Sequence, residues 1–323
     1  MDENKCLKIM KYAPIIIFAY NRADKLEQLL MSLEKNANTK KMDLYIFVDI
    51  PDKKNKRDLK YNQEVINYLL KYKKESSAFK KIQIEVSDRH KGLAESIISG
   101  VTKIINQFGK AIILEDDLKV SDDFLDYMQR GLVAYKNQKD VWSVAGYCPV
   151  FKMPKRYRND VYLMPRAESW GWGTWSDRWN KCDWQVKTYN KFRRNLIQQM
   201  LFNAGGDDLT DMLRKQMQNE QYNSWAIRWG YQQFIEKKYT VYPRESRVIH
   251  CGTDNRSTHG AYFDNQRLKD NYQRCRFVRL KLNWHIVWEF RKAYKVTTVE
   301  KIKRLFMDKL IYKLRGLLWI SYQ

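Results

Sequence analysis

Three consecutive carboxylates, Glu115, Asp116 and Asp117, directly follow an apolar run at residues 111–114. A short apolar run rich in β-branched residues predicts a buried strand. At the carboxyl end of such a strand in an open α/β sheet, side chains face the crevice where ligands bind. Three adjacent acids repel one another, and the hard divalent ions Mg²⁺ and Mn²⁺ prefer oxygen ligands. The triplet therefore predicts a metal site that would also neutralise a phosphate-bearing ligand.

The triplet has a second interpretation, in which it only favours the positive end of the helix expected at residues 121–136. Ser121, Asp122 and Asp123 are already suited to that role. Helix capping thus leaves the three preceding acids unexplained, and we favour the metal site over a solvated turn.

Two other stretches carry side chains suited to chemistry. The polar loop at residues 245–259 contains His250 and His259 beside Arg247 and Arg256, which favours anion or metal handling. Residues 169–184 are rich in tryptophan, with glycines between some of the rings. These rings either belong to the core or present faces on which a sugar or nucleobase stacks, and the sequence leaves both interpretations open.

The first half of the chain supplies the elements that would position the triplet. Apolar runs at residues 14–20, 43–49 and 111–114 and an alternating segment at residues 82–86 predict strands, and apolar residues repeat at helical spacing between them. This alternation predicts an α/β fold with a doubly wound, mostly parallel sheet and ligands at the carboxyl ends of its strands. The second strand also ends in an acid, Asp49. The turn after the first strand lacks a glycine-rich phosphate loop, so a bound nucleotide would depend on a metal.

The second half has shorter and less regular elements. Strands are expected at residues 141–145, 161–163 and 239–242, and helices at 209–217 and 224–237. After residue 267 the chain becomes basic, and residues 301–320 have an apolar face with lysines and arginines largely elsewhere. This pattern fits either a helix that lies on anionic lipid or a helix docked on the domain with a solvated basic face.

The composition limits the kind of partner. The 323 residues carry a net charge of +23, which implies nucleic acid, anionic lipid or a phosphorylated substrate. The five cysteines are scattered without a CxxC pair, which argues against a zinc module or a disulfide scaffold and favours a reducing compartment. We find no signal peptide and no run of apolar residues long enough to span a membrane, so a cytoplasmic protein is expected.

Three segments together resemble the GT-A-type glycosyltransferases, and within them the N-acetylglucosaminyltransferase I type and its bacterial relatives. Residues 115–127 are similar to the family's EDDLEVAPDFFEYF segment, and residues 243–264 to its PEISR…SHGQFFD loop. The first strand with Asn21 and Arg22 is similar to the start of the family's donor site. The similarity spans roughly residues 14–268 and implies the GT-A fold, with a basic C-terminal helical extension outside it.

The resemblance implies roles at a donor site. Asp117 would bind Mn²⁺ or Mg²⁺, and this ion would bridge the diphosphate of a UDP-sugar. Six further residues would contact the nucleotide, the donor sugar or the phosphates: Arg22, Asp49, Glu115, Asp116, Ser257 and His259. Family members invert the anomeric configuration by a single displacement, in which a carboxylate deprotonates the acceptor hydroxyl.

The chain departs from the family pattern at the catalytic base. The family carries a WDDW-like element before its PEISR segment, and the best counterpart here, residues 222–225, has Asn223 where an Asp is expected. Asn cannot accept a proton as a carboxylate does. Glu220 is the first substitute, followed by an acid among Asp207, Asp208 and Asp211. Otherwise the correspondence is shifted or the enzyme is impaired.

These features predict a metal-dependent, inverting hexosyl- or N-acetylhexosaminyltransferase that uses a UDP-sugar and a glycan or lipid-linked glycan acceptor. Residues 1–268 would form the GT-A domain, with a nucleotide-sugar half at 1–140 and an acceptor half with a closing loop at 141–268. Residues 269–323 would form a basic helical tail able to associate with the inner face of the cell membrane.

Three alternatives remain open at this point. A nucleotidyltransferase would share the acidic metal site but normally carries a glycine-rich phosphate loop. A nucleic-acid-binding protein would explain the charge and leave the acidic triplet without a role, so nucleic acid is not the expected partner. A non-catalytic nucleotide-sugar-binding relative is kept open by Asn223.

Overall fold

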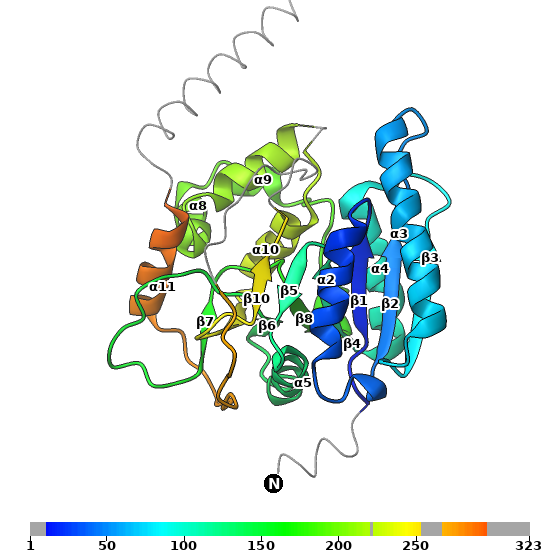
Figure 1. Ribbon diagram of the computed structural model, residues 1–323. Coiled ribbons are helices and arrows are strands. Elements are labelled where there is room, and N and C mark those ends of the chain that lie inside the picture. The colour runs from blue at the N-terminus through cyan, green and yellow to red at the C-terminus, as the bar shows by residue number, and fades with distance from the viewer. Residues whose placement is uncertain (1–10, 220–221, 253–266, 296–323) are drawn as a thin grey trace, which may run out of the picture.

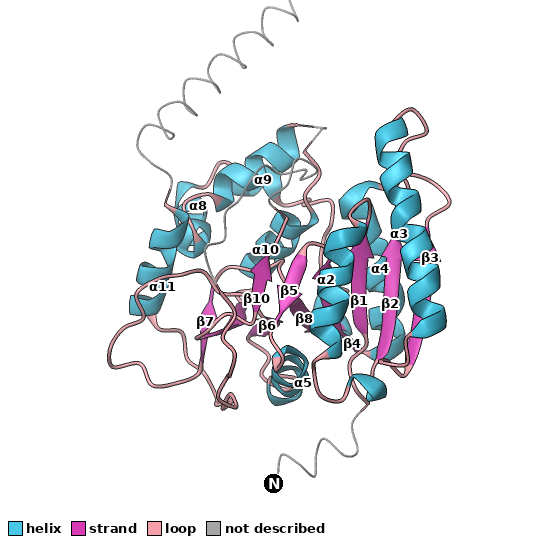
Figure 2. Cartoon of the chain, in the orientation of Figure 1, coloured by secondary structure: helices cyan, strands magenta, loops and turns pink. Residues whose placement is uncertain are grey.

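The computed structural model describes residues 11–219, 222–252 and 267–295. Eight strands form one sheet in the order β3-β2-β1-β4-β8-β6-β9-β7, with helices on both faces (Figure 1). Figure 2 shows that helices and strands alternate most regularly in the first half. The strands of this sheet are β1 (Ile15–Ala19), β2 (Asp43–Val48), β3 (Lys81–Val86), β4 (Lys110–Glu115), β6 (Val141–Ala145), β7 (Val161–Met164), β8 (Trp172–Trp175) and β9 (Tyr239–Pro243).

Four parallel strands make up the first half of the sheet, which confirms the predicted alternation. β1 pairs with β2 on one side and with β4 on the other, and β2 pairs with β3. α2 (Ala23–Glu34) and α3 (Lys56–Glu75) pack on one face, and α4 (Gly92–Phe108) packs on the other. Because parallel strands end at one edge of the sheet, the segments that follow β1, β2 and β4 come together there.

The second half mixes strand directions. β8 runs antiparallel between β4 and β6, β6 pairs with β9 in parallel, and β7 is antiparallel at the edge. The sequence pattern does not predict β8, because glycine between tryptophans is more typical of a loop. Gly173 explains how this strand fits, since a Cβ atom there would lie 2.9 Å from the carbonyl oxygen of Ala111 on β4. The close approach of the two strands therefore favours glycine.

A group of indole rings fills the layer between the sheet and α10 (Trp225–Ile235). The ring centroids of Trp142 and Trp229 are 4.4 Å apart, and those of Trp172 and Trp225 are 5.2 Å apart. Trp179 joins the same buried cluster. The tryptophan-rich segment is therefore mainly core, and Trp170 and Trp184 stay partly exposed. Trp170 lies at the functional site described below.

α5 (Phe124–Ala134) is shorter at both ends than the helix expected at residues 121–136. The helix starts after Asp123, and the carboxylate of Asp123 binds Arg247 instead of capping the helix. β5 (Leu118–Val120) and β10 (Val248–His250) form a separate antiparallel pair. The remaining elements are short: η1 (Thr39–Lys41), α6 (Ser176–Trp179), α7 (Tyr189–Phe192), α8 (Leu196–Phe202), η2 (Asn203–Gly205), α9 (Leu209–Gln218), α11 (Trp284–Arg291) and η3 (Lys292–Tyr294).

The fold continues past residue 268, where the sequence suggested a domain boundary. Residues 267–283 have no regular secondary structure and cross α5, where Tyr135 donates a hydrogen bond to the carbonyl of Val278. α11 then packs Phe290 against Tyr162 of β7 and Tyr242 of β9. Residues 269–295 therefore belong to the packed fold, and the tail helix expected at residues 301–320 lies outside the described residues. Within the described segments, no helix has the length and apolar character needed to cross a membrane.

Candidate functional site

One arginine joins two of the three carboxylates. Glu115 is the last residue of β4, and Asp116 and Asp117 follow in the turn to β5. The Nη2 atom of Arg22, from the turn between β1 and α2, donates to Asp116 Oδ1 at 3.0 Å and to Asp117 Oδ2 at 2.9 Å. The backbone N–H of Tyr20 also donates to Asp116, at 3.1 Å. The shared edge of the parallel strands thus assembles the acidic cluster, defined here as Glu115, Asp116 and Asp117 with Arg22.

The β5–β10 pair brings His250 to this cluster. Its Nε2 atom lies 3.0 Å from Asp117 Oδ2, and the backbone N–H of Cys251 donates to the carbonyl of Asp117 at 2.7 Å. Trp170 stacks on the imidazole with ring centroids 4.7 Å apart. Gly252 packs directly on the cluster, because a Cβ atom there would collide with the carboxylate of Asp117. His250, which is 133 positions from Asp117 in the sequence, is therefore a neighbour of this expected metal ligand.

Burial and mutual repulsion set the charges of the cluster. Burial raises the pKa of Glu115 to about 8, and the charges of Asp117 and Asp116 add to this effect. Burial also raises the pKa of Asp116 to about 6, against the opposing charge of Arg22. At Asp117, burial is outweighed by the hydrogen bond with His250 and by Arg22, so its pKa lies below the usual range. Asp117 therefore keeps its charge over the widest pH range, as a metal ligand must.

Asp117 and His250 fit a divalent ion that binds together with a nucleotide. The Nδ1 atom of His250 is buried and has no hydrogen-bond partner among the described residues. The described part of the chain holds no group of three or more His, Cys, Asp or Glu side chains arranged to hold an ion alone. At nucleotide sites, Mg²⁺ usually binds one or two carboxylates together with substrate phosphates. The residues present match that kind of site and not a closed cage of protein ligands.

Asp49 lies at the same edge of the sheet, after β2. Its carboxylate accepts hydrogen bonds from the backbone N–H groups of Lys91 at 2.9 Å and Gly92 at 2.8 Å. The Nδ1 atom of His90 lies 3.1 Å from Asp49 Oδ2, and its partly exposed ring lies beside Tyr20. Asp49 therefore holds the loop before α4 in place.

A cavity of about 370 Å³ is lined in part by Trp170. Trp170 also stacks on His250, which contacts Asp117, so its indole ring connects the cavity with the histidine beside the acidic cluster. Glu168 lines it as well, and burial raises the pKa of this carboxyl. Its Oε1 atom accepts hydrogen bonds from the backbone N–H groups of Ser169 at 2.9 Å and Trp170 at 3.1 Å. Aromatic and carboxylate groups in one wall suit a sugar ring.

The predicted catalytic residues are only partly placed by the structure. Asp208 lines the cavity, but its two oxygens bind Arg166 at 2.8 and 2.9 Å. Asn223 lies exposed before α10 and accepts a hydrogen bond from Arg228 at 2.8 Å. Three other predicted site residues lie outside the described part of the chain: Glu220, Ser257 and His259.

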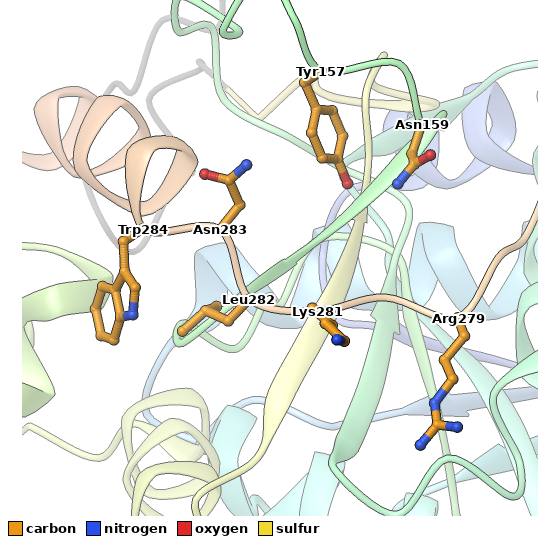
Figure 3. A pocket seen from close by; sticks show the side chains of 7 residues that line it. All are labelled: Tyr157, Asn159, Arg279, Lys281, Leu282, Asn283 and Trp284. Atoms are coloured by element: carbon orange, nitrogen blue, oxygen red, sulfur yellow. The ribbon is translucent and has the colours of Figure 1, made fainter.

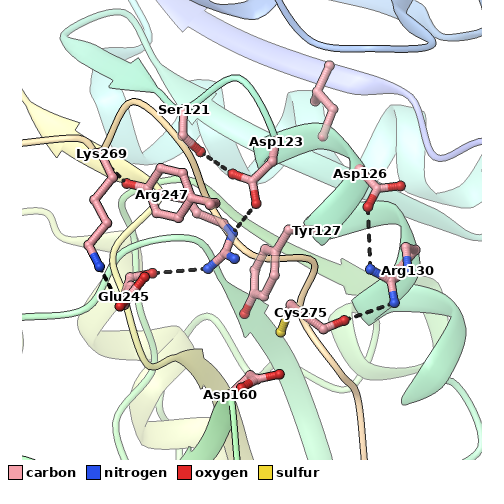
Figure 4. A network of polar contacts seen from close by, with 12 residues as sticks. Ser121, Asp123, Asp126, Tyr127, Arg130, Asp160, Glu245, Arg247, Lys269 and Cys275 are labelled. Carbon is pink, nitrogen blue, oxygen red and sulfur yellow. Dashed lines mark hydrogen bonds and ion pairs between the residues drawn. The ribbon is translucent and has the colours of Figure 1, made fainter.

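Arg247 serves the fold, in place of the anion handling expected for it. Its Nε atom donates to Asp123 at 2.9 Å, and its guanidinium lies over the ring of Tyr127 (Figure 4). Lys269 forms an ion pair with Glu245 at 2.6 Å. These contacts fasten the chain on both sides of residues 253–266, which include most of the expected closing loop.

Residues 1–232 match the family model described as the GNT-I family. The chain belongs to the GNT-I family. As a member it is a glycosyltransferase, and the resemblance read from the acidic triplet is confirmed. A curated relative, alpha-1,3-mannosyl-glycoprotein 2-beta-N-acetylglucosaminyltransferase of Arabidopsis thaliana, is 24% identical over 348 residues, covering 92% of this chain and 74% of the relative. With the mostly parallel sheet, this membership confirms the predicted GT-A fold class.

Solved structures similar to this GNT-I family member are distant. GalNAc-T7 with UDP, GalNAc and Mn²⁺ has a TM-score of 0.44 and 11% identity, covering 74% of this chain and 44% of that chain. S. aureus TarS 1-349 has a TM-score of 0.40 and 9% identity, covering 73% of this chain and 59% of that chain. This chain thus spans less than two thirds of each of these two proteins.

Sequence reasoning missed His90, Glu168 and Gly252 at the site. His90 had a usable signal, because it follows the expected strand at residues 82–86 and so had to lie at the ligand-binding edge. Glu168 is a lone acid outside any motif, and Gly252 is one glycine in a polar loop. Their roles depend on contacts between distant segments, which a single sequence does not reveal.

Proposed function

We propose that this glycosyltransferase moves a sugar from a UDP-sugar to a glycan or lipid-linked glycan, using Mn²⁺ or Mg²⁺ and inverting the anomeric configuration. The convergence of Arg22, Asp117 and His250 where β1 and β4 end is the observation that carries the proposal. This convergence supports the binding of an anionic ligand together with a metal ion. The name of the plant relative supports N-acetylglucosamine as the sugar. The cytoplasmic location expected from the cysteines stays a prediction.

The residues at and beside the cluster would have different roles in binding the donor. A bound divalent ion would neutralise the diphosphate and stabilise the departing UDP. Asp117 and His250 would hold this ion together with the phosphates. Arg22 fixes the orientation of Asp116 and Asp117 and adds positive charge beside them. Trp170, which lines the cavity and stacks on His250, would place an acceptor sugar next to the donor.

The displacement also needs a base, because the acceptor O–H bond breaks as its oxygen bonds to the anomeric carbon. Glu220 remains our first assignment from the sequence. Glu168 is the alternative that the cavity favours, since its carboxyl lines the space beside Trp170. Asp208 is less suited, because both of its oxygens form an ion pair with Arg166. The oxygens of Glu168 accept hydrogen bonds from uncharged groups, two backbone N–H groups and the hydroxyl of Tyr242.

A comparison of Glu220→Gln, Glu168→Gln and Asp208→Asn would identify the base. The variant that lacks the base should lose roughly 10²- to 10⁴-fold in kcat and still bind UDP with Mn²⁺ as the wild type does. Unchanged turnover in all three variants would exclude these acids as the base.

Calorimetric titration of UDP tests the donor site itself. The wild type should bind UDP only with Mn²⁺ or Mg²⁺, and Asp117→Asn should abolish this metal-dependent binding. Asp177→Asn, the same change at an exposed carboxylate on α6, is the matched control and should bind normally. Because the site offers few protein ligands, Mn²⁺ alone should bind weakly.

Two outcomes of this titration would change the proposal. UDP-sugar binding without hydrolysis or transfer would indicate a non-catalytic relative. No UDP binding under any metal condition would remove the donor site, and steeply salt-dependent binding to nucleic acid would then be the next measurement.

A further inference from the structure

The short helix α8 exposes nearly all of its large apolar side chains. Leu196, Ile197 and Met200 are 73%, 71% and 73% exposed, and Leu201 is 53% exposed. Phe202, at the end of the helix, is buried and anchors α8 in the fold. Large apolar side chains gathered in this way on a surface usually mark an interaction site.

α11 presents a second set of exposed apolar side chains. Trp284 and Trp288 are one helical turn apart, and each is 62% exposed. The opposite side of α11 is buried, with Ile286 and Phe290 in the fold. η2 follows α8 directly and contacts α11, and the two helices lie beside each other at one edge of the molecule (Figure 1).

Basic side chains surround both helices. Residues 187–201 contain four lysines or arginines and no acid. Residues 276–295 contain six, of which Arg276, Arg291 and Lys292 form ion pairs with Asp160, Asp207 and Glu289. Arg279 and Lys281 line an open hollow of about 560 Å³ that Trp284 also borders (Figure 3). Positively charged side chains thus surround the apolar ones, and the positive charge that lines the hollow suits phosphate groups.

We propose that α8 and α11 form a surface that docks on an anionic lipid bilayer. The aliphatic side chains of α8 would enter the boundary between headgroups and acyl chains, and the two indoles would lie at the level of the headgroups. The surrounding lysines and arginines would bind lipid phosphates. A second copy of this chain is a poorer occupant, because two such surfaces would bring like charges together.

The surface adjoins the cavity that Trp170 lines beside His250. Phe202 ends α8, Tyr294 follows α11, and both side chains line that cavity. The docking inference rests on the proposed function, because a lipid-linked acceptor would lie in the bilayer next to the elements that enclose the cavity. In this proposal, the acceptor comes from a lipid surface.

Vesicle sedimentation of the full chain tests the surface. We expect the wild type to bind vesicles of phosphatidylcholine with phosphatidylglycerol, and to bind vesicles of phosphatidylcholine alone much more weakly. The triple variant Leu196→Gln, Ile197→Gln, Met200→Gln and the double variant Trp284→Ala, Trp288→Ala should each lower the apparent affinity at least about tenfold. All these side chains are well exposed, so the variants should fold.

The control removes equally exposed apolar side chains elsewhere. Met31 on α2 and Leu70 on α3 are 58% and 60% exposed, and the double variant Met31→Gln, Leu70→Gln should bind vesicles as the wild type does. Residues 296–323 are present in every variant, so any difference reports on α8 and α11. Wild-type affinity in both test variants would overturn the proposal.

Two further measurements separate the possible failures. If the wild type forms dimers that the α8 variant disperses, and does not bind vesicles, the surface is an interface between copies and the proposal is overturned. UDP titration with Mn²⁺ is run in parallel, away from lipid. Vesicle binding without UDP binding would remove the proposed function and leave the docking surface supported. UDP binding without vesicle binding would overturn the docking surface and leave the proposed function supported.

Discussion

A single guanidinium, that of Arg22, holds together two carboxylates that would otherwise repel each other. Its contacts with Asp116 and Asp117 are 3.0 and 2.9 Å long, and all three side chains are largely buried. Buried charges need such partners, because removing a partner leaves an uncompensated charge in a poorly solvated place. A divalent ion at the proposed site would supply the same compensation, so arginine and metal would act on the same pair of acids.

The first prediction concerns the variant Arg22→Met, which removes this positive charge and keeps a long side chain. We expect the metal-free variant to lose about 2–3 kcal/mol in free energy of unfolding, because Asp116 and Asp117 remain buried without their cation. Saturating Mn²⁺ should restore more of the stability of the variant than of the wild type. Urea denaturation with EDTA and with Mn²⁺ measures both effects, and equal losses under the two conditions would contradict the shared role.

The second prediction concerns pH. The pKa of Glu115 is raised to about 8 from 4.5, so between these values the folded state keeps a proton that the unfolded state has released. Stability should therefore fall as the pH rises through this window. Asp116, with a pKa of about 6, acts in the same direction. The pKa of Asp117 is lowered, so its contribution is lost only as the pH falls into the acid range.

Thermal melts of metal-free protein check this pH dependence. From pH 5 to pH 8 we expect the melting temperature of the wild type to fall by roughly a few degrees, and that of Glu115→Gln to change less. Parallel curves for the two proteins would show that Glu115 does not titrate in this window.

At the scale of elements, the short pair β5–β10 positions the groups expected to bind the ligand. It places His250 and Gly252 against Asp117, the residue directly before β5. Each strand has only three residues, so the pair depends on the rest of the fold for its stability. A small change in its backbone would move the expected metal ligand directly.

The third prediction tests this pair with Gly252→Ala. The added Cβ atom would meet the carboxylate of Asp117, and it would lie 2.9 Å from Nη1 of Arg22. We expect UDP affinity with Mn²⁺ to fall about tenfold or more, with at most about 1–2 kcal/mol lost in stability. Gly230→Ala on α10 is the control, because its Cβ atom would have only an ordinary contact of 3.7 Å. Unchanged UDP binding by Gly252→Ala would show that the pair does not control the site.

The contrast among elements explains what the sequence could predict. Three of the four parallel strands are apolar runs and β3 alternates, and the end of β4 predicts where Glu115 to Asp117 lie. β5 and β10 are too short to carry a pattern, and β8 depends on the contact of Gly173 with Ala111. The neighbours of Asp117 from 95 and 133 positions away, Arg22 and His250, come together only through the sheet and the loop pairing. Arg22 was anticipated from a family resemblance and not from periodicity.

At the scale of the whole molecule, the segment after residue 268 closes the core. Cys275, Leu280, Ile286 and Phe290 are all buried there. Arg130 on α5 also donates a hydrogen bond to the carbonyl of Cys275 at 2.8 Å. Residues 269–295 thus cover apolar surface that the sheet and α5 would otherwise expose to water.

The fourth prediction compares chains that end at residue 268 and at residue 295. Each buried apolar side chain contributes about 1.5–3 kcal/mol, so losing several of them should cost more than about 5 kcal/mol. We expect the chain ending at 268 to aggregate or lack a cooperative urea transition, and the chain ending at 295 to unfold cooperatively. A folded chain ending at 268 would restore the domain boundary expected from the sequence.

The indole cluster between the sheet and α10 also gives the molecule an optical property. Trp142, Trp172, Trp225 and Trp229 have ring centroids as close as 4.4 Å, near enough for their electronic transitions to couple. Coupled transitions of fixed geometry produce paired circular-dichroism bands that disappear when the rings move apart. Trp170, outside this cluster and stacked on His250, should respond separately in fluorescence when a ligand reaches the imidazole. Circular dichroism can therefore report on core packing, and fluorescence on site occupancy, in the same sample.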